Sequence, residues 1–512
     1  MAALDGRSLD LAGLSRLVRG SGRVPLDVAS VERAARAATA PAGPAYGRTT
    51  GVGANRDVLV PSADRGHALR LWASHAAGAG PLLGHDEVRA MISVRVNQVL
   101  AGPTGLSAAC AGSLADALVR GFVPAVHRYG AVGTGDLTAL AELGLCLAGR
   151  RPWWRGEGDP PRPVEPEPGD GLALLSSNAL TLGVAALAAC DLERLARAGV
   201  AVAALTCLAS GAAADAYSPV AWPRRRDSAP AGHGADAPQS AHLSPRQPDP
   251  GPATADGASW VAGVLAHALV GHGRRLQDPY PLRAAPAWHG PLVAALAELS
   301  AELTVGINTS LENPIADAET GAWTHHAGLL ATGLTARLDA VRSALVTAAH
   351  GSLSRTRALH NPEITGLPAF LASGPRGSSG TMTCEYAAAA GCAELAQLAH
   401  PAATGWVTLS MGHEDGAAFA TQAAFAARDS VIPYTTVLAV ELLVAVRALR
   451  LAGWPGGETG ERASGWLSRI AERAVNALPA DLGDHDLGPD IQAATDILPD
   501  LAGAVLRDPV ES

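Results

Sequence analysis

The sequence predicts an all-α fold, a bundle of long helices with a minor β component. Three observations support this prediction. Apolar residues recur three and four positions apart in many Ala-rich stretches, which is the spacing of one helix face. Alternation of apolar and polar residues, the pattern of a half-buried strand, is scarce. The chain has 512 residues, 48% of them hydrophobic, and is therefore long enough to bury a large core.

Helical periodicity extends over six long stretches of the chain. In chain order they cover residues 114–126, 172–198, 260–276, 290–303, 328–353 and 437–451. The second stretch overlaps the longest uncharged run, residues 171–190, which approaches the length of a membrane span. Polar residues between positions 176 and 181 interrupt this run, so we expect a buried helix and no membrane partner. Short strands are expected only at residues 58–60 and near Trp153.

Two segments rich in proline and glycine interrupt the helical pattern. Residues 150–170 predict a loop or a short hairpin. Residues 218–257 have too few apolar side chains to pack and predict a disordered insertion. This insertion divides the chain into an N-terminal domain, residues 1–217, and a helical-bundle domain, residues 258–512.

Composition and charge exclude several classes of function. The formal net charge is -9, which argues against a nucleic-acid partner. All 39 basic residues are arginine, so every mechanism that needs a lysine is excluded, including pyridoxal-phosphate Schiff bases. Charged residues are mixed into the apolar N-terminus and predict no signal peptide. The 6 cysteines form no CxxC pair and indicate buried free thiols in a reducing cytoplasm.

A series of short motifs carries the functional information. In chain order they are residues 46–53 (YGRTTGVG), 74–82 (SHAAGAGPL), 130–140 (GAVGTGDLTAL), 277–283 (QDPYPLR), 308–314 (NTSLENP), 366–371 (GLPAFL) and 413–415 (HED). Each motif alone is weak evidence for a site. In this order and spacing they resemble the aromatic amino-acid ammonia-lyase family, which comprises histidine, phenylalanine and tyrosine ammonia-lyases and the related aminomutases. The resemblance covers most of the chain.

The resemblance implies a long-helix bundle of the fumarase and aspartase type, assembled as a homotetramer in which several subunits build each pocket. It also implies a small amino-acid substrate and no exogenous cofactor. The family makes its own electrophile, a methylidene-imidazolone, by cyclising a small residue, a serine and a glycine of the backbone. Small flanking residues allow two adjacent peptide units to approach within bonding distance.

This chain departs from the family pattern at the electrophile loop. Gly133, Thr134 and Gly135 occupy the place of the family's Ala-Ser-Gly, so a group formed here would carry an extra methyl on its alkene. That methyl would hinder attack at the electrophilic carbon and donate electron density to it. Ser176 replaces a family asparagine that polarises the ring oxygen, which agrees with an altered or missing ring. A modified group and no group are both open at this point.

The resemblance assigns roles to further residues. Tyr46 matches the loop tyrosine that removes the β-proton of the substrate. Arg283 matches the arginine that binds the substrate carboxylate, a task suited to a bidentate guanidinium. Tyr280 and Asn308 match residues that line the electrophile and the carboxylate. Glu414 matches a carboxylate near the amino group.

Histidines distinguish this pocket from the family pattern. Ser74 and His75 resemble the selectivity pair of histidine ammonia-lyases. His413 occupies the place of a family glutamine, and His325 and His326 begin the stretch that aligns with the family's Asn-Phe-His-Gly. No third ligand at helical spacing accompanies the adjacent pair, so no metal site is expected.

Three functions compete. The first is a carbon–nitrogen lyase, or an aminomutase, acting on an aromatic or histidine-like α-amino acid. The second keeps the pocket but dispenses with the electrophile, and uses Tyr46, Tyr280 and Glu414 for acid–base chemistry on an amino-acid-like substrate of specialised metabolism. The third is a non-catalytic relative, which the joint retention of Tyr46, Arg283 and Glu414 argues against. The sequence favours the first.

Overall fold

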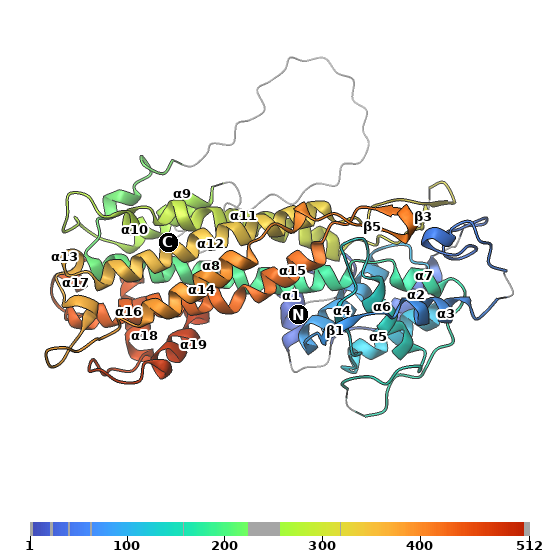
Figure 1. The fold of residues 1–512 in the computed structure, drawn as a ribbon, viewed down its shortest axis with the longest axis horizontal. Helices are drawn as coiled ribbons and strands as arrows, with labels where there is room; N and C mark the ends of the chain where they lie inside the picture. Colours follow the sequence, from blue (N-terminus) through green and yellow to red (C-terminus); the bar gives the residue numbers. More distant parts are fainter. Residues whose placement is uncertain are drawn as a thin grey trace, which may run out of the picture. The chain divides into compact units, whose positions relative to one another are not determined.

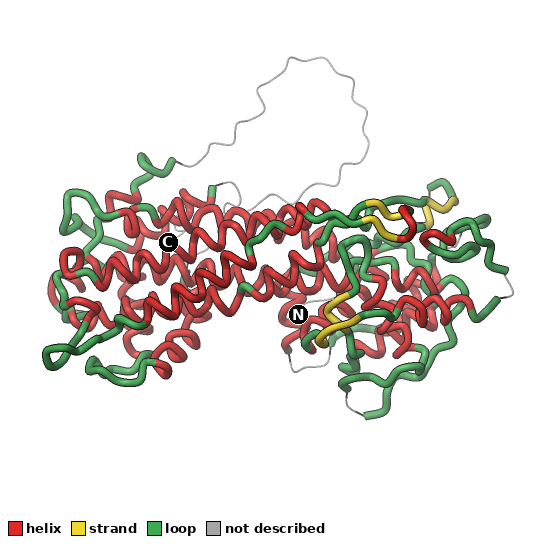
Figure 2. The backbone as a smooth tube through the Cα atoms, in the orientation of Figure 1, coloured by secondary structure: helices red, strands yellow, loops and turns green. Residues whose placement is uncertain are grey.

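The computed structural model describes residues 4–20, 24–38, 41–61, 64–156, 158–223, 256–317 and 319–505 (Figure 1). Helices dominate and the strands are few and short (Figure 2). The prediction of an all-α long-helix fold with minor β hairpins is therefore confirmed. Residues 224–255, most of the predicted insertion at 218–257, lie outside the described residues. The division into residues 1–217 and 258–512 stays a prediction.

Two compact units make up the chain, and each combines three stretches of sequence. Unit 1 comprises Met1–Cys190, Leu299–Ala340 and His400–Asp429. Unit 2 comprises Asp191–Glu298, Val341–Ala399 and Ser430–Ser512. Three helices contribute residues to both units, namely α8 (Ala179–Ser210), α11 (Ala285–Ile307) and α12 (Thr332–His360).

Unit 1 contains short helices and all the strands of the described chain. Its helices are α1 (Leu11–Arg19), α2 (Val28–Ala37), α3 (His67–His75), α4 (His85–Ala101), α5 (Ala108–Val119), α6 (Leu137–Leu147), α7 (Asp170–Leu175) and α15 (Ala420–Asp429), with 3-10 turns η1 (Gly53–Asn55), η4 (Ala402–Thr404) and η5 (Ser410–Gly412). Helix α2 packs on α5, and α3 packs on α6. Trp72 lies fully buried on α3 and donates its indole N–H to the Gly171 carbonyl at 2.9 Å.

The strands of unit 1 form three two-stranded antiparallel pairs. They are β1 (Ala79–Leu82) with β2 (His127–Tyr129), β3 (Ile315–Asp317) with β4 (Ala322–Thr324), and β5 (Thr408–Leu409) with β6 (Glu414–Asp415). In the second pair Ala316 is opposite Trp323. The two strand candidates from the sequence form only isolated bridges, Thr50 with Leu59 and Val123 with Arg155. Their neighbouring residues form turns instead.

Unit 2 is a helical bundle. Its other helices are α9 (Gly257–Ala268), α10 (Tyr280–Arg283), α13 (Pro362–Thr365), α14 (Cys384–Leu398), α16 (Val431–Leu451), α17 (Gly457–Glu461), α18 (Gly465–Ala477) and α19 (Gly488–Ala504), with η2 (Ala214–Tyr217) and η3 (Ala369–Leu371). Helix α16 packs on α14 and α19. Its centre carries buried Glu441, which pairs with fully buried Arg355 at 2.6 Å.

Capping side chains explain where several helices begin. Asp27 accepts a hydrogen bond from the Ala29 N–H at the start of α2, and Ser107 does the same for Cys110 at the start of α5. Such side chains satisfy backbone donors that have no partner within the helix. At the start of α4 the Glu87 carboxylate accepts the Gly84 N–H at 2.7 Å. Local sequence therefore fixes these boundaries.

The predicted helices are found, with shifted ends. The stretch 172–198 is split between α7 and α8, because Ser176, Ser177 and Asn178 leave the helical path. The stretch 260–276 is helical only to Ala268, the end of α9, and glycines follow it.

Three helical stretches of the described chain are long and apolar enough to cross a membrane, judged by length and composition alone. The buried share of the apolar window is 94% in Asp170–Ser210 and 78% in Ala420–Leu451. It is only 33% in Tyr280–Ile307. The uncharged run 171–190 is thus a buried part of the fold, as the sequence predicts. Among the described residues, most of the helix that ends at Ile307 is only partly buried, and Val305 on it is 63% exposed.

Candidate active site

The loop at residues 130–136 has a backbone that only glycine adopts easily. Gly133 has φ +82° and Gly135 has φ +116°, both in the left-handed region. A Cβ on Gly133 would lie 2.7 Å from the Ala420 nitrogen, closer than side-chain carbons approach. Thr134 lies between these glycines and is half-buried. The two small residues of the triad are therefore required by the fold, whatever chemistry the loop performs.

Hydrogen bonds from distant segments to its backbone carbonyls hold this loop. The Phe419 N–H donates to the Val132 carbonyl at 2.8 Å, and the Ala331 N–H donates to the Gly133 carbonyl at 3.0 Å. The side-chain amide of Gln422 donates to the Ala131 carbonyl at 2.8 Å. Three successive carbonyl groups of the loop are thus satisfied before Thr134 begins, which fixes its position.

Asp136 joins the loop to α8. Its carboxylate accepts hydrogen bonds from the Thr181 N–H and from the Thr181 hydroxyl, both at 2.8 Å. Its own N–H donates to the Ser177 carbonyl at 2.7 Å. Complete burial raises the pKa of Asp136 to about 6, although the hydrogen bonds from Thr181 oppose the shift.

Hydrogen bonds hold Tyr46 both at its side-chain hydroxyl and at its backbone N–H. Its Oη accepts the Gly53 N–H at 2.6 Å, and its own N–H donates to Nε2 of His325 at 3.2 Å. Burial raises the pKa of Tyr46, and the charge on Glu414 raises it further. The Gly53 N–H and Arg56 act in the opposite direction. The pKa of the Tyr46 hydroxyl therefore depends on its burial and on three groups, Gly53, Glu414 and Arg56.

Two cavities of about 530 and 370 Å³ open beside these groups, both lined wholly by unit 1. They share five lining residues: Tyr46, Thr134, Asn313, Leu329 and Glu414. His325, His326 and His413 line the larger cavity, and His75 and Ser176 line the smaller one. The structure thus brings together residues that the sequence had connected only through the motif series.

Asn313 is a site residue that the sequence reading did not identify. Its N–H donates to the Ser176 hydroxyl at 2.9 Å, and the same hydroxyl donates to the Asn313 carbonyl at 3.1 Å. The Asn313 side-chain oxygen accepts the His326 N–H at 3.0 Å. Its signal was the Asn-Pro pair closing the motif at 308–314.

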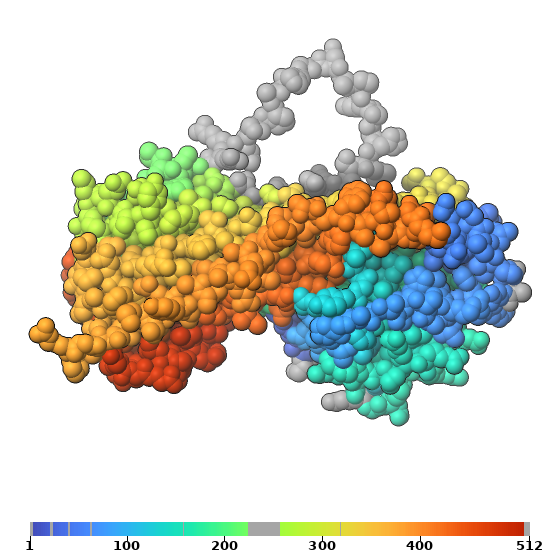
Figure 3. All heavy atoms as spheres, viewed as in Figure 1, coloured from blue at the N-terminus to red at the C-terminus, as the bar shows by residue number. Residues whose placement is uncertain are grey.

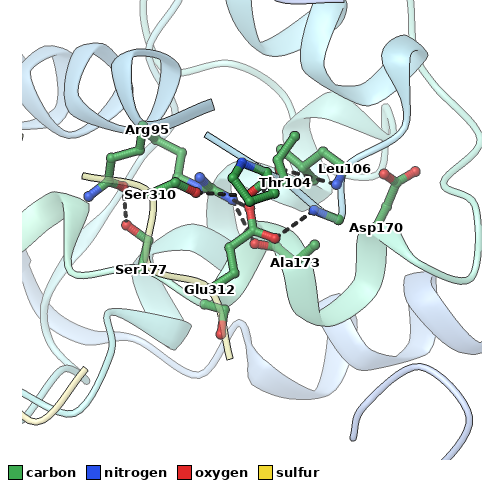
Figure 4. A network of polar contacts seen from close by, with 12 residues as sticks. Arg95, Thr104, Leu106, Asp170, Ala173, Ser177, Ser310 and Glu312 are labelled. Atoms are coloured by element: carbon green, nitrogen blue, oxygen red, sulfur yellow. Dashed lines mark hydrogen bonds and ion pairs between the residues drawn. The ribbon is translucent and has the colours of Figure 1, made fainter. Parts of the chain in front are cut away.

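A buried ion pair supports Asn313 from the preceding residue (Figure 4). Arg95, on α4, donates to one Glu312 carboxylate oxygen at 2.6 Å, and the Thr104 hydroxyl donates to the same oxygen at 2.6 Å. The Gly105 N–H donates to the other oxygen at 2.7 Å. Both charged side chains are at most 3% exposed. The Glu312 carbonyl also accepts Nε2 of His326 at 2.7 Å, so this network holds both Asn313 and His326.

Several predicted residues lie elsewhere. Asn308 lines neither cavity, because its side chain forms hydrogen bonds with Leu9, Thr304 and Asn97. Ser74 is exposed, and its hydroxyl is 3.1 Å from Nδ1 of His75.

Tyr280 and Arg283 belong to unit 2, on α10. The Arg283 guanidinium carbon lies 4.1 Å from the centre of the Tyr280 ring, and its Nε donates to the Asp278 carbonyl at 2.8 Å. Tyr280 is 63% exposed. Among the described residues, no group of three His, Cys, Asp or Glu side chains is arranged to hold a metal ion.

Comparison with known proteins adds to this geometry. The aromatic amino acid lyase family model matches residues 9–472. Histidine ammonia-lyase from Anaeromyxobacter sp. (strain K) is 31% identical over 526 residues, covering 97% of this chain and 98% of that protein. The histidine ammonia-lyase of Streptomyces coelicolor is 31% identical over 490 residues, covering 90% of this chain and 86% of that protein.

Solved structures share the fold at lower identity. Histidine ammonia-lyase from Trypanosoma cruzi matches with a TM-score of 0.81 at 22% identity, covering 98% of this chain and 95% of that one. Tyrosine aminomutase from Streptomyces globisporus matches with a TM-score of 0.81 at 22% identity, covering 99% and 98%.

Proposed function

Because this chain belongs to the aromatic amino acid lyase family, we propose that it eliminates ammonia from an aromatic or histidine-like α-amino acid. The family makes it an enzyme of the carbon–nitrogen lyase class. One observation carries the proposal for this chain: Tyr46, Thr134 and Glu414 line both cavities. A candidate base, the electrophile position and a carboxylate therefore face the same space.

The electrophile loop fits the family's imidazolone at its backbone. Gly133 and Gly135 supply the small residues and the left-handed backbone, and the carbonyls of residues 131–133 are already hydrogen-bonded. When formed, a group held by Gly133, Thr134 and Gly135 would supply the electron sink that activates the amino group for departure. Thr134 would give its alkene one methyl more than serine gives.

Tyr46 is proposed to remove the β-proton of the substrate at its Oη. To act as a base the phenol must first lose its own proton, and burial beside Glu414 resists that loss. The Gly53 N–H, 2.6 Å from Oη, stabilises the phenolate and favours it. Glu414 is proposed to face the amino group, where a carboxylate attracts an ammonium.

Substrate orientation is proposed to depend on the remaining residues. Asn313, fixed by Ser176 and Glu312, offers its side-chain amide to the cavities. Arg283 is proposed to bind the substrate carboxylate once copies of the chain assemble. His75 and His413, one in each cavity, favour a side chain that accepts or donates hydrogen bonds, such as imidazole.

Assembly as a homotetramer in the cytoplasm completes the proposal. The apolar window of Tyr280–Ile307 is only 33% buried, and Val305 within it is 63% exposed, which supports burial of this face by other copies. All 6 cysteines are free and buried, which is compatible with a reducing compartment.

Intact mass and turnover together test the lyase proposal. We expect the purified protein to weigh less than its sequence by the mass of two waters, and to release ammonia from histidine, phenylalanine or tyrosine. Chromatography of the products separates an unsaturated acid from a β-amino acid, the product of an aminomutase. An unmodified mass together with no turnover would contradict the proposal.

A second candidate function keeps the pocket and does without the electrophile. Thr134 favours it, because the extra methyl opposes attack at the alkene. In this case Tyr46→Phe abolishes turnover while Thr134→Ala does not. The lyase proposal expects both variants to lose activity, so the pair of variants separates the two candidates. A non-catalytic relative would show neither turnover nor a shift of its melting temperature with any amino acid.

A further inference from the structure

Ser410 connects the two loops that carry the proposed base and the proposed carboxylate. Its hydroxyl oxygen accepts the Ala54 N–H at 2.9 Å. Turn η5, which begins at Ser410, lies against turn η1, which begins at Gly53. In the space-filling view the orange surface of residues near 410 lies against the blue surface of residues near 50 (Figure 3). Ser410 also lines the smaller cavity, together with Tyr46 and Glu414.

Gly53 makes this approach possible. Its φ is +58°, and a Cβ at this position would overlap Oγ of Ser410. Gly53 is also the residue whose N–H donates to Oη of Tyr46. The hydroxyl of Ser410 therefore lies against Gly53, which donates to the Tyr46 phenol, and it accepts a hydrogen bond from Ala54, the next residue. A displacement of Ser410 would move Gly53, whose N–H is the backbone donor to Oη within the described part of the chain.

The backbone at Ser410 is strained. Ser410 has φ 52° and Met411 has φ 56°, two consecutive left-handed residues without glycine. The structure around them must hold this conformation, and such strain is concentrated at functional sites. Glu414, which lines both cavities, lies four residues after Ser410 on the same loop.

We propose that Ser410 is a positioning residue that holds the Gly53 N–H on Oη of Tyr46 and thereby sets the basicity of Tyr46. This inference rests on the proposed function, in which Tyr46 is the base. In this assignment Ser410 acts on Oη through Gly53 and carries out no step of the reaction itself, although it lines the smaller cavity. The groups that face Tyr46 directly are His325 at its N–H, the His413 ring with its centre 6.3 Å away, and the charges of Glu414 and Arg56.

Three variants separate the hydroxyl from the strain. Ser410→Ala removes the hydroxyl and keeps the strained backbone. Ser410→Gly removes the hydroxyl and also relieves the strain. Thr404→Ala is the matched control, because Thr404 is an exposed residue of the same segment whose hydroxyl bonds only the Pro401 carbonyl among the contacts described.

Kinetics form the first readout. We expect kcat to fall about tenfold or more in both Ser410 variants, with KM changed less than about twofold, because a small displacement at a catalytic group is costly. We expect the rising limb of the pH profile of kcat/KM to move to higher pH, since the lost N–H stabilises the phenolate. Ser410→Gly should melt at a higher temperature than wild type, because the strain is relieved, and yet lose as much activity as Ser410→Ala; activity and melting temperature then move in opposite directions. Thr404→Ala should match wild type.

Hydrogen exchange by mass spectrometry forms the second readout and needs no substrate. Peptides covering residues 46–56 should exchange faster in Ser410→Ala than in wild type or Thr404→Ala. If wild type turns over no amino acid, the proposed function fails, while the exchange result still decides whether Ser410 holds the loop. The positioning role is overturned by unchanged exchange, by an unmoved pH limb, or by activity that simply follows stability across the three variants.

Discussion

Thr134 differs from the family's serine by one methyl group, and this difference can be tested alone. Thr134→Ser removes the methyl from the proposed alkene without altering the left-handed glycines on either side. We expect kcat to rise about tenfold, which is the usual effect of one methyl group on the rate in a tightly packed site. Ammonia release and intact mass measure the effect, and Thr404→Ser provides the control. A variant with unchanged rate and unmodified mass would show that the loop does not form an electrophile.

Asp136 couples the stability of the same loop to pH. Its pKa is about 6 in the folded protein, against 3.8 for the exposed group. A carboxyl group with a raised pKa stabilises the folded state most below the unfolded value, and this contribution is lost as pH rises through the folded value. Relative to Asp136→Asn, wild type should therefore lose on the order of 3 kcal/mol of unfolding free energy between about pH 4 and pH 7.

Urea unfolding of both proteins at the two pH values measures this difference. The comparison with Asp136→Asn cancels the other titrating groups, which are common to both proteins. Parallel changes in the two proteins would mean that folding does not raise the pKa of Asp136.

Helix α4 and the segment around Asn313 depend on a single buried ion pair. Arg95→Met would leave the buried Glu312 carboxylate with the Thr104 and Gly105 donors and with the charge of Arg48 nearby. We expect a loss of about 3 kcal/mol of unfolding free energy, because removing the bonded partner of a buried charge is costly. Denaturant titration measures it, and Glu312→Gln added to Arg95→Met should restore part of the loss.

The exposed pair of Arg36 and Glu32 offers the control for this experiment. Its N–O distance is 3.0 Å, but Arg36 is 64% exposed. Arg36→Met should therefore change stability by less than about 1 kcal/mol. Equal effects of Arg36→Met and Arg95→Met would refute a special role for the buried pair.

Helices were the part of the fold that could be predicted from the sequence. The stretches 290–303 and 437–451 lie within α11 and α16. Both are long apolar runs of good helix formers, and in α16 the burial extends around the whole helix. Helix ends were less predictable. The break at residues 176–178 depends on hydrogen bonds to Asn313, Gln98 and Leu329, which no local pattern announces.

Motif order led to Tyr46, Thr134, Glu414 and His75, all of which line the cavities. It did not lead to Ser410, because the importance of that serine depends on contact with a turn more than three hundred residues away along the chain. A bond between distant segments leaves no periodic signal in either one. The supporting residues of a site are therefore harder to predict than the residues that carry its chemistry.

The apolar helix α11 makes assembly testable for the whole molecule. We expect light scattering to give a mass of about four times 51.8 kDa for wild type. Val305→Asp places a charge at an exposed apolar side chain of α11 and should shift the protein to smaller species, since burying a charge between subunits opposes association. Val305→Thr, similar in size and uncharged, is the control. A monomeric wild type, or an unchanged mass for Val305→Asp, would contradict the proposed assembly.

Three separate stretches of chain line the cavities of unit 1, and the last of them ends at Asp429. During synthesis the ribosome must therefore release more than four fifths of the polypeptide before Phe419 can bond Val132 and bring the loop at Thr134 to its final shape. Any backbone cyclisation at that loop is consequently a late event in the life of the molecule. Nascent chains and truncated products would carry the same triad and yet be chemically inert.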